Sequence, residues 1–346
     1  MSARRLLALL TCALIVAGGA YYTLAGHDAK RADPAVGTRV LPGLAERLGT
    51  IATIRIVGGG QRTLLTLSRR ADQWQVDEYG YPADDARARR VLLALAELRI
   101  VETKTADPAR YAALGVDEPA GEASQALRVE LRGAGPPIAL LVGRPAGERS
   151  GYVRLPGNAA ALEARPALDL ARTPRDWLSR TIVDLAAERV QSVEVRPASG
   201  PAWLAQRADR AAAHFSVALP KGRELTSLGA ADGAAHALGA LELEDLRRVT
   251  NPDAVPRPEG MVVRCFDGLI VTLEGREQQA EHWIRVRAKY DTAVADRFRD
   301  GTTPPVTDGA RQQAERLTRI ASGWEYRIAA YRSEALFRKR DDFVRH

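Results

Sequence analysis

The residue types best suited to acid–base or metal chemistry are five histidines that lie far apart in the sequence. They are His27, His214, His236, His282 and His346. No His-Glu-x-x-His motif and no cysteine pair at metal-ligand spacing accompanies them, so the sequence does not indicate a metal site. A solvent-facing or hydrogen-bonded histidine is expected at each position, with His236 in a predicted helix and His282 in a predicted strand.

Three other short motifs contain residue types that could bind phosphate or act as acids and bases. Gly58-Gly59-Gly60 follows a strand, as a phosphate-binding loop would, but a second strand comes next, so the helix N-terminus that would hold a phosphate is missing. A hairpin is expected there. Asp84-Asp85 is explained by helix capping, and Asp341-Asp342 lies in a predicted exposed tail. No Gly-x-Ser-x-Gly motif is present. We therefore expect no catalytic, cofactor-binding or metal-binding residues, no cofactor and no enzymatic activity.

The elements that would position any site begin with a stretch from Ile51 to Val101. Within it, Ile54–Ile56, Leu65–Leu67 and Trp74–Val76 alternate apolar with polar residues, which predicts three half-buried strands. Asp84 then offers an N-cap to a predicted amphipathic helix. The apolar residues at helical spacing are Val91, Leu92, Leu95 and Leu98.

This stretch is predicted to occur twice, because the chain matches itself at an offset of about 139 residues. In the first half of the repeat, Val190, Val193 and Val195 match Ile51, Ile54 and Ile56, in that order. Leu204 then matches Leu65, and Phe215–Val217 lies near the position of Trp74–Val76. The segment Ala235–Leu246 takes the place of the helix. The later matches are Leu127–Leu131 with Met261–Cys265, Ile138–Gly143 with Leu269–Gly275, and Tyr152–Arg154 with Trp283–Arg285. Any two antiparallel stretches share a period of two, but the preserved order of six elements favours a repeat.

The predicted fold class is α+β. An N-terminal transmembrane helix precedes two tandem similar units, each mostly antiparallel sheet with one amphipathic helix, and a C-terminal helical and strand extension follows. The predicted segments are a tail and anchor (1–26), a tether (27–48), a first unit (49–170), a second unit with a bridging helix (171–300) and the extension (301–346). Shorter predictions are helices at 107–115, 173–178, 309–322 and 333–346, and a last strand at Trp324–Ile328.

The N-terminal stretch from Leu6 to Gly26 carries no charge. A helix of about 20 residues, rising 1.5 Å per residue, spans the roughly 30 Å hydrocarbon layer of a bilayer. The predicted anchor residues are Leu6, Leu7, Leu9, Leu10, Leu14, Ile15, Val16, Tyr21, Tyr22 and Leu24. A cleaved signal peptide ending near Gly18-Gly-Ala20 is the competing interpretation. A lipoprotein box at Cys12 and a twin-arginine signal at Arg4-Arg5 are poor matches.

Basic residues flank this stretch on both sides, so their count does not set its orientation. Arg4 and Arg5 precede it, and Lys30, Arg31 and Arg39 follow it. Long domains translocate largely regardless of charge, and about 320 residues follow the apolar stretch. We therefore expect a single-pass protein of the bacterial inner membrane with most of its chain in the periplasm.

Composition narrows the class of partner. Fifty basic and 43 acidic residues give a net charge of +7, but no basic cluster is interleaved with aromatic residues, which argues against nucleic acid. Cys12 and Cys265 lie in different predicted segments, so no intramolecular disulfide is expected. Trp74, Trp203, Trp283 and Trp324 are predicted to anchor cores from strands. Trp177 opens the bridging helix and is predicted to pack between the units.

Several of these motifs resemble a bacterial family of unknown function. The motifs are Trp74-Gln-Val76, Tyr81-Pro-Ala-Asp84, Asp107-Pro108, Leu114-Gly-Val116, Leu140-Leu-Val-Gly143, Gly151-Tyr-Val-Arg154, Asp176-Trp177, Trp324-Glu-Tyr326 and Arg338-Lys-Arg-Asp341. Members of that family are membrane-anchored, and their genes often neighbour those of gliding-motility-type ABC transporters. The resemblance implies an accessory role in the envelope and carries no catalytic residues. Loops such as Arg207 to His214 depart from the family's pattern.

The sequence thus leads to three hypotheses of different classes. The first is a non-enzymatic, membrane-anchored periplasmic accessory or scaffold protein beside an ABC-type transporter, with the inner-membrane bilayer and an integral-membrane protein as partners. The second is a periplasmic binding module for an envelope glycan or peptide, with a groove between the units. The third is an enzyme, which would require a pocket that brings His214, His236 or His282 next to a carboxylate or serine.

Overall fold

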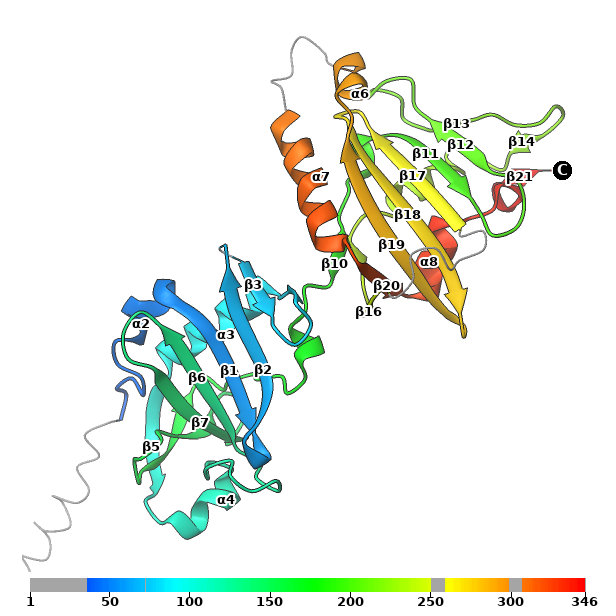
Figure 1. The fold of residues 1–346 in the computed structure, drawn as a ribbon. Coiled ribbons are helices and arrows are strands. Elements are labelled where there is room, and N and C mark those ends of the chain that lie inside the picture. The colour runs from blue at the N-terminus through cyan, green and yellow to red at the C-terminus, as the bar shows by residue number, and fades with distance from the viewer. Residues whose placement is uncertain (1–35, 72, 250–258, 299–306, 346) are drawn as a thin grey trace, which may run out of the picture. The chain divides into compact units, whose positions relative to one another are not determined.

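The computed structural model describes residues 36–71, 73–249, 259–298 and 307–345. Contacts divide the chain into two compact units: the first ends at Leu178 and the second begins at Ser179. Each unit is built around one large sheet (Figure 1).

The first unit contains a nine-stranded sheet in which all pairings are antiparallel. In spatial order its strands are β4 (Tyr81–Pro82), β3 (Gln73–Val76), β2 (Arg62–Arg70), β1 (Ile51–Gly58), β6 (Leu127–Gly133), β7 (Ile138–Pro145), β8 (Gly151–Arg154), β9 (Ala161–Arg165) and β5 (Arg99–Thr105). Its helices are α2 (Leu44–Arg47), α3 (Asp85–Glu97) and α4 (Tyr111–Leu114).

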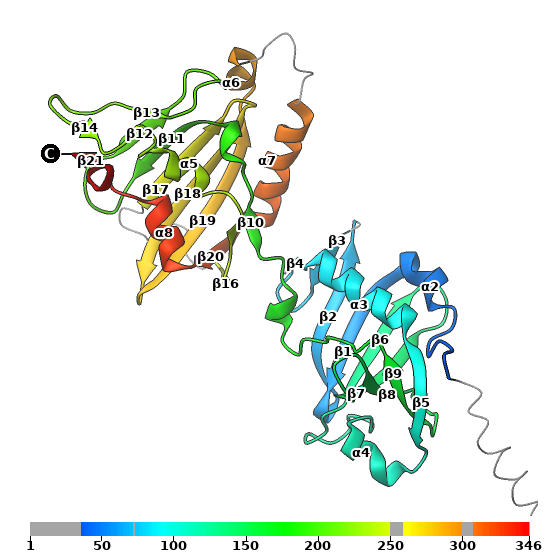
Figure 2. The ribbon, with the colours of Figure 1, turned by 180° about the vertical axis from the view of Figure 1, so that it is seen from behind.

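Helix α3 lies across one face of this sheet (Figure 2). It begins where predicted, because the Asp84 carboxylate accepts a hydrogen bond from the Arg87 backbone N–H at 3.0 Å. Its buried side is made of Ala88, Val91, Leu92, Leu95 and Ala96. On the sheet, Ile54 and Ile56 are fully buried, whereas Arg55 between them is partly exposed. Full burial of one such Leu or Ile side chain contributes about 1.5–3 kcal/mol.

The second unit contains an eight-stranded sheet, again antiparallel throughout. In spatial order its strands are β13 (Ser216–Val217), β12 (Trp203–Gln206), β11 (Val190–Arg196), β17 (Glu259–Cys265), β18 (Leu269–Gln278), β19 (Glu281–Tyr290), β20 (Trp324–Ile328) and β16 (Asp245–Arg248). Two small sheets pair β10 (Thr181–Val183) with β15 (Leu241–Glu242) and β14 (Glu224–Leu225) with β21 (Val344–Arg345). The helices are α5 (Asp232–His236), α6 (Thr292–Arg297), α7 (Thr307–Ala321) and α8 (Ala330–Leu336).

The two large sheets share one strand order. The order β3-β2-β1-β6-β7-β8-β9-β5 in the first unit corresponds to β13-β12-β11-β17-β18-β19-β20-β16 in the second. The pairing of β1 with β6 shifts register between Ile51 and Thr53, and that of β11 with β17 shifts between Val190 and Ser192. These are the positions that the offset of 139 residues equates, so the predicted match of Ile51 with Val190 is confirmed.

Further along the chain, the predicted register of the repeat is wrong by two residues. Leu131 on β6 pairs with Ile54, and Val263 on β17 pairs with Val193. Leu131 therefore corresponds to Val263 and not to Cys265. A shift of two keeps the same residues on the buried face, because side chains alternate with a period of two, so the hydrophobic pattern alone does not detect it.

The units differ in what is added to the shared sheet. In the first, a short turn joins β8 to β9, whereas in the second, α6 and α7 lie between β19 and β20. Helix α7 packs against β19 and β18, and the Thr318 hydroxyl donates to the Ala288 carbonyl at 2.7 Å. In the first unit, the connection from β5 to β6 carries α4, which ends at Gly115 with a φ of 71° as the sequence predicted.

The predicted α+β fold class is wrong, because the described residues are mostly β-sheet. The predicted helix Ala235–Leu246 is present only as the five-residue α5, followed by Ala240 at a φ of 45° and by strands β15 and β16. The strand predicted at Trp324–Ile328 is confirmed as β20, but it lies inside the large sheet and not in a separate extension. The tail contains α8, a short 3₁₀ helix at Arg340–Phe343 and β21 instead of one terminal helix.

The predicted transmembrane helix is not seen. No helix among the described residues has the length and apolar character needed to cross a bilayer. The predicted span, Leu6–Gly26, lies outside the described residues.

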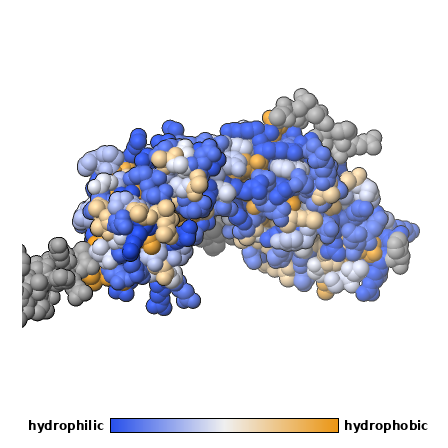
Figure 3. All heavy atoms as spheres, turned by 90° about the horizontal axis from the view of Figure 1, so that it is seen from below, coloured by the Kyte–Doolittle hydropathy of each residue, from blue (hydrophilic) through white to orange (hydrophobic). Residues whose placement is uncertain are grey.

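Hydrophilic residues cover most of the face visible in Figure 3, and apolar residues are scattered over it in small groups. The exposed large apolar side chains are Val36, Leu93, Leu204, Leu228 and Tyr331. Single exposed apolar residues of this kind are ordinary on protein surfaces.

Candidate functional site

The histidines were the first candidates for chemistry, and one of them does contact a carboxylate. His214 Nδ1 lies 2.7 Å from Asp232 Oδ2, and the other oxygen of Asp232 accepts from the Phe215 backbone N–H at 3.0 Å. The side chain of His214 is 51% exposed. The pair joins the start of α5 to the segment before β13, and neither residue lines the two hollows described below. It is a surface contact that fixes a loop.

The remaining predicted candidates also have structural contacts or lie outside the described residues. His236 Nδ1 lies 2.9 Å from the Asp232 carbonyl, and His282 is in β19. His27, His346 and the ten predicted anchor residues between Leu6 and Leu24 lie outside the described part of the chain. No group of three or more His, Cys, Asp or Glu residues in the described part is placed to hold a metal ion.

Adjacent acids of the sequence accept hydrogen bonds from backbone N–H groups. Asp84 caps α3, and Asp85 accepts from the Trp74 backbone N–H at 2.9 Å. Asp342 accepts from the Lys339 backbone N–H at 3.1 Å. A carboxylate held by a backbone N–H is an acceptor with a structural task, so these acids are not placed for acid–base catalysis.

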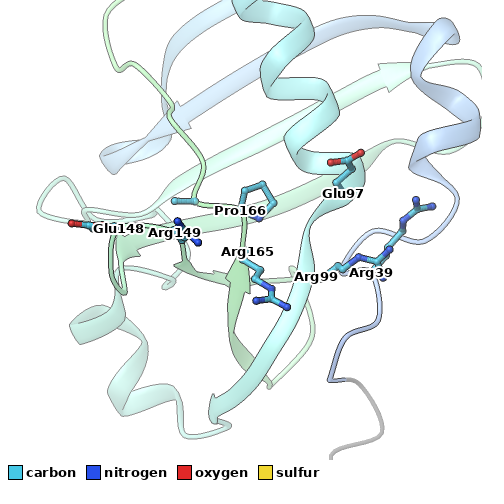
Figure 4. Close-up of a pocket in the computed structure, with 8 residues that line it drawn as sticks. Arg39, Glu97, Arg99, Glu148, Arg149, Arg165 and Pro166 are labelled. Carbon is cyan, nitrogen blue, oxygen red and sulfur yellow. The ribbon is translucent and has the colours of Figure 1, made fainter.

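A hollow of about 700 Å³ in the first unit is lined by four arginines (Figure 4). Arg39 comes from the segment before α2, Arg99 from the start of β5, Arg165 from the end of β9, and Arg149 from the loop before β8. The remaining lining residues are Glu97, Glu148, Pro166 and Ala167. In Figure 4, Glu148 points away from the arginines.

Three of these arginines form one row across the edge of the sheet, which we call the arginine row (Arg39, Arg99 and Arg165). Arg99 pairs directly with Arg165 between β5 and β9, and Arg39 pairs with Arg99 in an isolated antiparallel bridge. Directly paired residues of antiparallel strands point to the same face. Neighbouring strands are about 4.8 Å apart, so the row spans about 10 Å at the backbone.

The arginine row is not neutralised within the described part of the chain. None of Arg39, Arg99, Arg149 and Arg165 forms an ion pair with a described acidic residue. Arg99 donates to the Gly37 carbonyl at 2.8 Å, and the Nε of Arg39 is enclosed without a hydrogen-bond partner among the described residues. Like charges directly opposite each other on a sheet are destabilising. The arginines of the row thus lie close together without an ion pair among the described residues, although Glu97 and Glu148 also line the hollow.

In the second unit, by contrast, three arginines pair with one shared carboxylate. The carboxylate of Glu325, with 4% of its side chain exposed, accepts from Arg247 at 2.9 Å, from Arg276 at 2.6 Å and from Arg285 at 2.8 Å. Burial raises the pKa of Glu325, but the hydrogen bonds from Arg285, Arg247 and Arg276 lower it more, so the pKa lies below its ordinary value. This cluster joins β16, β18, β19 and β20 and has an evident structural role.

A second paired cluster lies on β5 and β9 of the first unit. Glu102 and Glu163 are cross-strand neighbours, and the Lys104 ammonium contacts both carboxylates. The Ser150 hydroxyl donates to Glu163 at 2.7 Å, and this bond and the one from Lys104 lower the pKa of Glu163. Lys104 thus holds both carboxylates, and Ser150 also holds that of Glu163, which gives this cluster a structural role.

A smaller hollow of about 310 Å³ lies between Leu48, Trp74 and Leu92 in the same unit. Its rim carries Arg69, Asp85 and Arg89. Asp85 is engaged by the Trp74 backbone, so the lining offers mainly packing surface. We regard the arginine-lined hollow as the stronger candidate site.

Sequence reasoning did not single out the arginine row. Its members are 60 or more positions apart, and each stands among ordinary strand-end residues. Neither β5 nor β9, the strands that carry Arg99 and Arg165, was predicted from the sequence. The arginines become neighbours only because β5 pairs with β9, the last strand of the unit, although three other strands lie between them in the sequence.

Comparison with known proteins places the chain in a family. Residues 74–258, more than half of the chain, match the model of DUF4340, a domain of unknown function. The match begins in β3 of the first unit and ends before β17 of the second. The chain matches no curated protein and no solved structure. The chain belongs to the DUF4340 family.

Proposed function

We propose that this protein is a non-enzymatic accessory or scaffold protein of the bacterial cell envelope that associates with an integral-membrane partner of the ABC-transporter type. The observation that carries the proposal is the way the polar residues are used. In the described part of the chain, Asp84 caps α3, Asp85 and Asp232 accept from backbone N–H groups, and Glu325 belongs to an ion-pair cluster. Two copies of one sheet give such a protein two similar surfaces on which a partner can dock.

The proposed location is the inner membrane, with most of the chain in the periplasm. The uncharged sequence from Leu6 to Gly26 supports a position at the membrane, and the roughly 320 residues that follow it support translocation. The gene neighbourhood that the family resemblance implies supports the choice of an ABC-type partner. These are expectations that a localisation experiment can test.

Affinity purification from detergent-solubilised membranes tests the proposal. The full-length chain, tagged at its C-terminus and expressed from its own promoter, should recover an integral-membrane protein that an unrelated periplasmic protein with the same tag does not recover. Recovery of the chain alone under several mild detergents would count against an accessory role.

A ligand-binding module is the second candidate function, and the hollow in the first unit favours it. Ligand pockets usually have volumes of about 300–1,000 Å³ and a few convergent polar groups. The arginine-lined hollow has a volume of about 700 Å³, and four arginines line it.

A further inference from the structure

We propose that the arginine-lined hollow of the first unit is a binding site for a ligand that carries two or more phosphate groups. The inference gives the second candidate function a ligand class, and it does not depend on whether a protein partner exists. It rests on the placement of the arginines, their lack of ion pairs among the described residues and the cost of keeping them together.

The placement of the side chains sets the class of ligand. Guanidinium groups bind phosphate and carboxylate oxygens through two parallel hydrogen bonds each. A row of three arginines about 10 Å long at the backbone is longer than one anionic group can satisfy. Arg149 enlarges the set at the side of the hollow next to Pro166 (Figure 4). A ligand with several anionic groups, such as an oligophosphate or adjacent phospholipid headgroups, fits this row.

The lack of ion pairs to these arginines among the described residues indicates that the site is preorganised for an anion. Other arginines of the described chain that meet on a sheet share a carboxylate, as Arg247, Arg276 and Arg285 share Glu325. No arginine of the row forms an ion pair with a described acidic residue. Glu97 and Glu148 also line the hollow, so its four arginines and two glutamates give the lining a net charge of +2, and Glu148 points away from the arginines in Figure 4.

The effect of the arginine row on folding stability distinguishes a binding role from a structural role. Cross-strand like charges lower stability, so replacing one of them should stabilise the free protein or leave it unchanged. The same replacement should weaken anion binding. If the arginine had a purely structural role, its replacement would lower the stability of the free protein, because a supporting contact would be lost.

The test uses the purified full-length chain and calorimetric titration with sodium tripolyphosphate and, separately, inorganic phosphate. Tripolyphosphate should bind more tightly than phosphate, and its affinity should fall as salt increases. Arg165→Gln should lower the affinity roughly tenfold, the effect of losing one charge-assisted pair, and Arg165→Glu should abolish binding. Arg165 is chosen because no described side-chain contact depends on it.

The matched control is Arg132→Gln, which removes one positive charge from the same unit at an exposed position away from the hollow. It should leave the affinity for tripolyphosphate unchanged. In parallel, thermal unfolding without ligand should show Arg165→Gln to be at least as stable as the wild-type chain.

Vesicle flotation separates the two sources of phosphate. If binding to phosphatidylglycerol vesicles, but not to phosphatidylcholine vesicles, depends on Arg165 while tripolyphosphate does not bind, the ligand is a lipid headgroup. If tripolyphosphate binds in an Arg165-dependent way, the ligand is a soluble oligophosphate. The proposal is overturned if neither probe binds, if Arg165→Gln and Arg132→Gln lower affinity equally, or if Arg165→Gln binds like the wild-type chain. Failure of membrane co-purification would leave this result unaffected.

Discussion

At the scale of single residues, the same side chain has opposite roles in the two units. Arg247, Arg276 and Arg285 converge on the nearly buried Glu325, whereas Arg39, Arg99 and Arg165 converge on no described carboxylate. Removing one partner of a buried ion pair leaves uncompensated charge, which is costly. The role of an arginine in this fold is therefore decided by what the register places opposite it.

Glu325→Gln should destabilise the second unit by about 2–3 kcal/mol, because three arginines lose their shared negative charge. The value lies below that of a fully buried pair because Arg247 and Arg276 have 35% and 26% of their side chains exposed. Denaturant titration measures the effect. Glu194→Gln is the matched control, since its pair with Arg264 is exposed on both sides and should change stability by less than about 1 kcal/mol. Equal effects of the two variants would show that the cluster adds nothing.

The lowered pKa of Glu325 also predicts a pH dependence. A carboxylate whose pKa is lower in the folded state than in the unfolded state stabilises the fold above its unfolded pKa, and this stabilisation is lost as pH falls through the folded pKa. The ordinary value is 4.5, so the contribution should be complete above that pH and decline below it. Glu325→Gln should flatten this part of the acid unfolding curve of the second unit. An unchanged curve would contradict the role of Glu325.

How far the sequence predicts single residues depends on whether their partners are local. The caps at Asp84 and Asp107 were predicted, because each accepts from a backbone N–H two or three residues away. The burial of Trp74, Trp203, Trp283 and Trp324 in strands is confirmed as well. The arginine row and the Glu325 cluster were missed, since their members meet only through pairings between distant strands.

At the scale of elements, close backbone approach fixes where α4 sits. A Cβ on Gly143 of β7 would lie 2.2 Å from the Leu114 carbonyl oxygen, and one on Gly121 would meet nothing within 4 Å. The end of α4 therefore packs directly on the β7 backbone. This contact helps to close the small cluster of Tyr111, Val116 and Ala161.

Gly143→Ala should destabilise the first unit by about 1–3 kcal/mol, the usual range for overpacking a close contact. Gly121→Ala should have little effect, because its added methyl group has room. Thermal unfolding of both variants measures the difference. If Gly143→Ala is as stable as Gly121→Ala, α4 does not rest on β7 as described.

Helices and strands were predicted correctly where the local sequence pattern favours the same structure that the tertiary packing requires. Helix α3 has a cap and an apolar stripe, and Gly58–Gly60 joins β1 to β2 through a short turn, as expected of a hairpin. The predicted helix at Ala235–Leu246 failed, because its helix-favouring Ala, Leu and Glu residues lie where the chain must supply β15 and β16. Pairing with β10 and β20 outweighs intrinsic helix propensity there.

At the scale of the whole molecule, one strand order is used twice with different additions. The sequence predicted the repeat from periodicity, but it did not predict that the last strand of each sheet pairs with an earlier one, β5 with β9 and β16 with β20. Such a pairing carries no local signal. It enlarges each sheet at its edge, and in the first unit that edge carries the arginine row.

Because each unit has its own sheet and core, the two units should unfold in separable transitions. Glu325→Gln should then lower only one transition temperature, and Gly143→Ala only the other. Differential scanning calorimetry of the full-length chain measures both. A single transition that both variants shift equally would show that the units unfold together.

Crosslinking in intact cells tests the proposed accessory role most directly. A carbodiimide that joins carboxylates to amines, followed by affinity purification and mass spectrometry, reports partners at native abundance through the 43 acidic residues of the chain. We expect crosslinks to the periplasmic loops of an integral-membrane protein, and the same crosslinks in the Arg165→Gln variant if the hollow serves a separate ligand. Crosslinks confined to the chain itself or to soluble proteins would contradict the accessory role.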